Sequence, residues 1–141
     1  MTEEAPAPER LETPTGARLL DGRAIAAEVR ERIAERVTAR VAAGGARPGL
    51  AVILVGADPA SRIYVRNKRR ACEQAGIDST VLTLPADTSQ SMLLEEVDRL
   101  NGDASVHGIL VQAPLPPHLD GDAVIDRIAP EKDVDGFHPW N

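Results

Sequence analysis

Tyr64 and Lys68 are residues whose types and spacing could do chemistry together. They lie in a segment, Ala60 to Cys72, that is predicted to be helical, and side chains four apart share one helix face. A lysine amine partly desolvated in a cleft can lose its proton near neutral pH and act as acid or base. The same spacing is also typical of a solvated amphipathic face. The position of the helix directly after an apolar run, in a chain with 2% aromatic residues, adds weight to the chemical interpretation, and the sequence leaves both interpretations open.

Gln112 stands at the end of an otherwise apolar run that begins at His107. Burying its amide is costly unless the amide is hydrogen-bonded. The prolines that follow fix the backbone and can include a cis peptide bond. Gln112 is therefore either a polar group held at a site or the wet end of a strand, and the sequence leaves both interpretations open.

Asp133 and Asp135 place two carboxylates at alternate positions before Gly136. They indicate either a ligand-binding loop or a solvated Asp-Gly turn. An EF-hand is excluded, because no glycine occupies the sixth position from Asp133. The three scattered histidines and the single cysteine form no zinc pattern, so we expect no metal site. Neither a GxGxxG nor a GxxxxGK[ST] phosphate loop is present, so no cofactor-binding residue is expected in this chain.

Composition narrows the function classes further. The net charge of −6 argues against a nucleic-acid or anionic-membrane surface, but it does not exclude a local basic patch of arginines around Lys68. The lone Cys72 fits a reducing compartment and is expected to pack quietly on the buried side of its helix. No apolar run reaches membrane-spanning length and no signal peptide is recognisable, so we expect a cytoplasmic protein.

The elements that must position these residues alternate between helical and strand patterns. Residues 1–16 are rich in proline and glutamate and are expected to form a disordered tail, which leaves residues 17–141 as one domain. Asp21 is predicted to cap a helix whose face carries an apolar residue at every fourth position: Ile25, Val29, Ile33, Val37 and Val41. Strands are predicted at 50–55, 77–84 and 107–112, and further helices at 60–76, about 90–101 and 122–128. In the helix near 90–101, one side is expected to be lined by Met92, Leu93, Val97 and Leu100.

This order predicts an α/β fold: three layers, with a mostly parallel sheet and helices on both faces. Ligands of such folds bind beyond the carboxyl ends of the strands. The loops after Val55, Leu84 and Gln112 would then share one edge.

Three segments, 55–77, 108–116 and 130–139, together resemble one known family. They are similar to the catalytic domain of bifunctional methylenetetrahydrofolate dehydrogenase/methenyltetrahydrofolate cyclohydrolase. The resemblance covers about residues 17–141, with the motifs in the family's order. It implies a cytoplasmic enzyme of one-carbon metabolism that uses tetrahydrofolate derivatives as substrates, NADP as cofactor, and assembles as a homodimer.

The resemblance also implies residue roles. Lys68 corresponds to the catalytic lysine, Tyr64 would contact the aminobenzoyl ring, Gln112 would hydrogen-bond the lysine, and Asp135 would recognise the pteridine. The substrate-binding residues implied in addition are Val65, Arg66, Asn67, Val111 and Ala113. Ala113 stands where the family usually has leucine, a departure that loosens the expected pocket wall.

Family members continue beyond the position of Asn141 into a dinucleotide-binding domain, and a C-terminal helix folds back onto the first domain. We therefore expect this chain alone not to support the NADP-dependent step. The alternatives to a catalytic domain are a non-catalytic folate-binding or pairing module and a vestigial fragment.

Overall fold

The computed structural model describes residues 20–56 and 58–141. Its elements follow the predicted alternation: α1 (Gly22–Ala42), β1 (Gly49–Val55), α2 (Pro59–Ala75), β2 (Asp78–Leu84), α3 (Gln90–Gly102), β3 (Gly108–Val111), α4 (Gly121–Arg127) and a 3-10 turn, η1 (Pro130–Lys132). The proposed tail, residues 1–16, lies outside the described residues.

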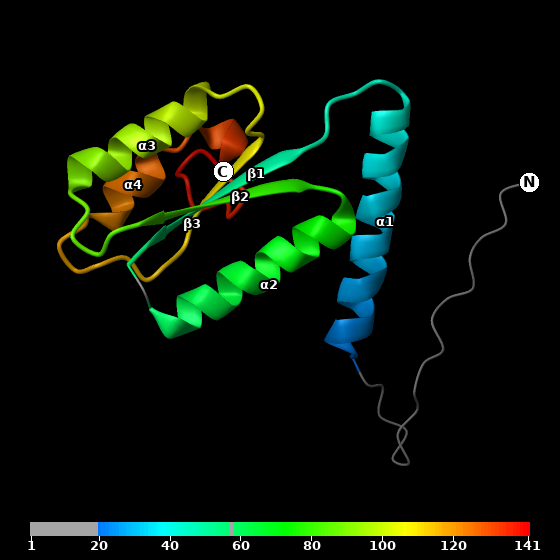
Figure 1. The fold of residues 1–141 in the computed structure, drawn as a ribbon, viewed down its shortest axis with the longest axis horizontal. Coiled ribbons are helices and arrows are strands. Elements are labelled where there is room, and N and C mark those ends of the chain that lie inside the picture. Colours follow the sequence, from blue (N-terminus) through cyan, green and yellow to red (C-terminus); the bar gives the residue numbers. More distant parts are fainter. Residues whose placement is uncertain (1–19, 57) are drawn as a thin grey trace, which may run out of the picture.

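The sheet has the order β2-β1-β3, and both pairings are parallel. At its centre, Ile53 of β1 is in register with Leu82 of β2 and Val111 of β3. Helices α3 and α4 lie on one side of the sheet and α2 on the other. Helix α1 lies beside the C-terminal end of α2 (Figure 1). The predicted three-layer α/β fold is confirmed.

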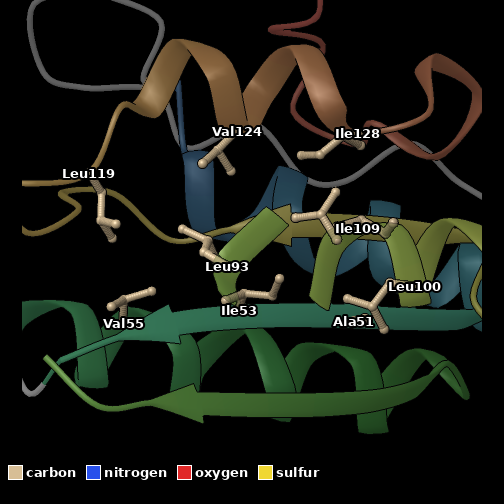
Figure 2. Packing of buried hydrophobic residues seen from close by; sticks show 10 residues of the cluster. Ala51, Ile53, Val55, Leu93, Leu100, Ile109, Leu119, Val124 and Ile128 are labelled. Atoms are coloured by element: carbon tan, nitrogen blue, oxygen red, sulfur yellow. The ribbon is translucent and has the colours of Figure 1, made fainter. Parts of the chain in front are cut away.

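Alternate residues of β1 supply two separate cores, because successive side chains of a strand point to opposite faces. Figure 2 shows the larger core, in which Val124 of α4 and Leu93 of α3 lie over Ile53, while Ile128, just after α4, lies over Ile109. On the opposite face, Val52 and Leu54 pack with Val65 of α2 and Leu110 of β3. β1 is thus buried on both faces, as its continuous apolar sequence predicts.

Two predicted apolar faces are wrong in part. Along α1 only Val37 is buried, while Ile25 and Val29 are 51% and 42% exposed, because α1 contacts α2 rather than the sheet. In α3, Leu93, Val97 and Leu100 reach the core, but Met92 is 56% exposed and points away from it.

The element boundaries follow from local capping. Asp21 caps α1 by accepting hydrogen bonds from the backbone of Arg23 and Ala24, as predicted. β2 begins one residue later than the sequence indicates, because the Ile77 N–H bonds Cys72 O at the end of α2. Gly76 makes that turn possible with a left-handed φ of 72°.

Candidate active site

Lys68 and Gln112 come together at the carboxyl end of the sheet, 44 positions apart in sequence. Lys68 lies in the middle of α2, half-buried, and Gln112 directly follows β3. Lys68 Nζ donates a hydrogen bond of 3.0 Å to Gln112 Oε1. The Gln112 Nε2 donates in turn to the backbone carbonyl of Ala113 at 2.9 Å, which fixes which amide atom faces the lysine.

Helix α2, which carries Lys68, is capped at its N-terminus by a side chain. Asp58 caps its N-terminus by accepting a 2.7 Å hydrogen bond from the Ser61 N–H. The hydrogen bonds from Ser61 hold the pKa of the Asp58 carboxyl below its usual value. Val65 packs against β1 and Cys72 is also buried, while Lys68 on the same helix is half-buried. Burial, followed by the nearby Glu73 carboxylate, raises the pKa of the Cys72 thiol.

The segment after β3 turns sharply at a cis peptide bond between Ala113 and Pro114. Its far end is joined to the start of α3 by the side chain of Gln90, which accepts from the Asp120 N–H at 2.9 Å and donates to the Asp120 carbonyl at 3.3 Å. The His118 ring also bonds the Thr88 carbonyl at 2.9 Å. The segment is therefore held at its start, where the Gln112 N–H donates to the Ile53 carbonyl at 2.9 Å, and at its far end by these side-chain contacts.

Asp135 lies at the lip of a cavity of about 170 Å³ beside the end of β3. The lining is mostly apolar and comes from β3, the segment after it, α4 and the loop after η1. Its residues include Val111, Ala113, Leu115, Ile125, Asp133, Asp135 and Phe137. A mostly apolar cavity with two carboxylates suits a flat heterocycle that offers N–H donors at one edge.

The structure divides the sequence-derived site residues into groups. Lys68 bonds Gln112, while Val111, Ala113 and Asp135 line the cavity. Tyr64 is one turn before Lys68 and 60% exposed, and Arg66 and Asn67 are exposed on α2. Val65, three residues before Lys68, is buried in the core against β1.

Sequence reasoning did not assign a specific role to several residues around the site. Phe137 lines the cavity although it lies outside the implied set. Asp133 accepts four hydrogen bonds, and Lys132 donates to three backbone carbonyls. The only sequence signal for Asp133 was its alternation with Asp135, which did not tell the two carboxylates apart.

Within residues 20–56 and 58–141, no group of three or more His, Cys, Asp or Glu side chains is placed to hold a metal ion. Across the same ranges, no helix combines the length and apolarity needed to cross a membrane.

Residues 20–135 match the family model described as tetrahydrofolate dehydrogenase/cyclohydrolase, catalytic domain. The chain belongs to this family. The predicted resemblance to the methylenetetrahydrofolate dehydrogenase/cyclohydrolase catalytic domain is thereby confirmed. A curated relative, bifunctional protein FolD 1 of Hydrogenovibrio crunogenus, is 57% identical over 125 residues, which are 89% of this chain and 44% of the relative.

Solved structures of the dehydrogenase/cyclohydrolase family share the fold. The bifunctional FolD enzyme of Campylobacter jejuni aligns with a TM-score of 0.83 at 47% identity, over 85% of this chain and 42% of its own. The Trypanosoma brucei enzyme, solved with NADP cofactor and inhibitor, aligns with a TM-score of 0.83 at 41% identity, over 87% and 42%. The chain thus spans less than half the length of these relatives.

Proposed function

We propose that this chain supplies the folate-binding, catalytic domain of a methylenetetrahydrofolate dehydrogenase/methenyltetrahydrofolate cyclohydrolase. The observation that carries the proposal is the hydrogen bond between Lys68 and Gln112 at the carboxyl edge of the sheet, in a chain of this family. An amine held by a neutral amide oxygen is directed without being neutralised by a carboxylate. It can therefore give and take a proton at a bound substrate.

The cavity beside β3 supports the assignment of the folate's pteridine to this region. The Asp135 carboxylate is exposed at its lip and accepts no hydrogen bond from any described residue, so it is available to N–H groups of a ligand. Charge-assisted hydrogen bonds of this kind are stronger than neutral ones. Tyr64, one turn before Lys68 and 60% exposed, would contact the part of the folate that leaves the cavity.

In the proposed hydrolysis, water attacks the methenyl carbon and transfers a proton to the Lys68 amine. The bond from that carbon to one ring nitrogen then breaks. The nitrogen takes up the hydroxyl proton as the water oxygen becomes the carbonyl oxygen of a formyl group, and the Lys68 ammonium releases its proton to solvent. Gln112 holds the amine beside the reacting carbon through both proton transfers. Proton transfer by a positioned side chain contributes about 100- to 10,000-fold in rate.

NADP, which the family uses, does not fit the described residues. A dinucleotide's phosphates bind at free N–H groups of a helix N-terminus. All four α-helices in the described ranges are already capped by their own side chains, three by the carboxylates Asp21, Asp58 and Asp120 and one by Ser89. A carboxylate at this position repels phosphate, so we derive no hydride-transfer step from these residues.

The test is to mix the purified chain with methenyltetrahydrofolate and follow the loss of its absorbance. We expect hydrolysis above background, reduced at least about 100-fold in Lys68→Ala. Arg70→Ala is the matched control, since it removes an exposed cation from the same helix. Hydrolysis at the same rate in Lys68→Ala and the unaltered chain would contradict the catalytic role. Bound folate without turnover would favour the non-catalytic folate-binding module instead.

A domain spanning 17–141, cytoplasmic location and assembly as a homodimer stay predictions. Size-exclusion chromatography with light scattering measures the assembly directly.

A further inference from the structure

A cluster of polar contacts lies just before and within residues 133–138, which we call the Asp135 loop. We propose that Asp133 is a positioning residue, whose carboxylate folds the Asp135 loop so that Asp135 and Phe137 face the cavity. The inference deepens the proposed folate site and rests on it. It assigns different tasks to two carboxylates that look equivalent in the sequence.

The Asp133 carboxylate accepts four hydrogen bonds, three from its own loop and one from the Asn141 side chain. Its Oδ1 accepts from the N–H groups of Asp135 and Gly136, both at 3.2 Å. Its Oδ2 accepts from the His138 N–H at 2.8 Å and from Asn141 Nδ2 at 3.2 Å. Burial by itself raises the pKa of Asp133, but these donors, led by His138, hold it below the usual value. The charged carboxylate is therefore the form that the folded loop requires.

The residues before the loop fasten it to the body of the domain. Lys132 Nζ donates to the carbonyls of Leu100, Asn101 and Asp103 at 2.8–3.0 Å, at the C-terminal end of α3. The Asn101 side chain accepts from the Ala129 N–H at 2.9 Å. With the start of the loop fixed in this way, the Asp133 side chain decides the path of the residues that follow.

The backbone of Asp133 is also fixed against the sheet. It forms a parallel bridge with Ile109 of β3. Val134, the next residue, packs over Gly108 so closely that a Cβ on Gly108 would lie 2.5 Å from Val134 Cγ1. The start of the loop is thus held at a defined position beside β3.

The consequence is a division of labour between the two carboxylates. Asp133 is half-buried and its carboxylate accepts hydrogen bonds from the loop. Asp135 is exposed, and its carboxylate accepts no hydrogen bond from the described residues. Both line the same cavity as Phe137. Holding a ligand-binding carboxylate in place before the ligand arrives lowers the ordering cost of binding.

The test compares Asp133→Asn with Glu131→Gln, which removes an exposed charge two residues away. Asparagine keeps one acceptor oxygen but turns a donor toward N–H groups that need an acceptor. In amide hydrogen exchange without any folate, we expect at least about 10-fold faster exchange at Gly136 and His138 in Asp133→Asn, with α2 unchanged. Asn141→Ala removes one of the four donors and should give a smaller effect. Exchange in Asp133→Asn equal to that in Glu131→Gln would overturn the proposal.

The second measurement is the KM for methenyltetrahydrofolate. Because the Lys68–Gln112 pair is untouched, Asp133→Asn should raise KM about 10-fold with little change in kcat. The double variant with Asp135→Asn should be no worse than Asp135→Asn alone, since both act through one carboxylate. Additive losses, or a normal KM in Asp133→Asn, would overturn the positioning role. Absence of turnover and binding in the unaltered chain would instead refute the proposed function, while hydrogen exchange still decides the role of Asp133 in the loop.

Discussion

Lys68 Nζ lies 3.0 Å from Gln112 Oε1, so that a helix on one face of the sheet is joined to the residue that ends the neighbouring edge strand. The amide of Gln112 is oriented by its second hydrogen bond, to its own chain at Ala113. The lysine therefore meets an acceptor whose direction is fixed before any substrate binds. Such preorganisation is what makes a proton-transfer group effective.

Replacing Gln112 by methionine should lower cyclohydrolase activity about 10-fold while hardly changing the Tm. Methionine fills similar volume but offers the Lys68 amine only a weak acceptor. Gln74→Ala, at an exposed position of α2, is the control and should behave like the unaltered chain. The assay is the same absorbance decay, paired with thermal unfolding. An unchanged rate in Gln112→Met would show that the hydrogen bond does not direct the amine.

Gly49→Ala should destabilise the fold by about 1–3 kcal/mol, because an added methyl group would overlap the backbone carbonyl of Ser105. Gly49 also donates its N–H to His107 Nδ1 at 3.0 Å, so any shift loosens the contact between the starts of β1 and β3. The control is Gly22→Ala at the start of α1, where no described atom lies within 4 Å of the new Cβ. Urea unfolding measures both free energies. Equal midpoints for the two variants would contradict the close approach.

The ion pair between Asp98 of α3 and Arg127 of α4 should make stability depend on pH. Arg127 Nε and a terminal nitrogen donate to the two Asp98 oxygens at 2.6 and 2.7 Å, and these bonds hold the Asp98 pKa below its ordinary value of 3.8. A lowered folded-state pKa stabilises the fold above the unfolded value, and this contribution is lost as pH falls through the folded value. The Tm difference between the unaltered chain and Asp98→Asn should be constant above about pH 5 and disappear in acid. Asp126→Asn, an exposed neighbour on α4, controls for charge alone. A difference that persists in acid would refute this linkage.

Leu93→Ala should cost about 2–5 kcal/mol, since Leu93 is completely buried between α3 and the sheet. Met92→Ala, one residue earlier and 56% exposed, should stay within about 0.5 kcal/mol. The pair separates burial from helix propensity, because both positions lie in the same turn of α3. Chemical denaturation of the two variants gives the comparison, and a costly Met92→Ala would mean that its side chain is covered in solution.

The sequence predicts the parallel sheet, and the edge of the sheet at which the loops meet, because both depend on local sequence patterns. Continuous apolar runs identify strands covered on both faces, and the alternation with helices fixes their parallel direction. The exposure of the Met92 side chain could not be predicted from the sequence. Periodicity shows which side chains share a face, but it does not show how far a neighbouring element reaches over them.

The site followed from the sequence less completely than the fold. The contact between Lys68 and Gln112 spans 44 positions and was implied by the family resemblance, not by any local pattern. Asp133 and Asp135 have the same chemistry and nearly the same sequence surroundings. The two differ only in the folded chain, where four donors are positioned to hydrogen-bond the Asp133 carboxylate.

The exposure of α1 has a consequence for how the domain opens. Val37 is the single fully buried residue of this 21-residue helix, and α1 rests on α2 rather than on the sheet. Little apolar surface is therefore exposed when α1 detaches, whereas opening β1 would uncover both cores at once. The domain should behave as two cooperative units of unequal stability, with the amides of α1 exchanging through local opening and those of β1 only through global unfolding.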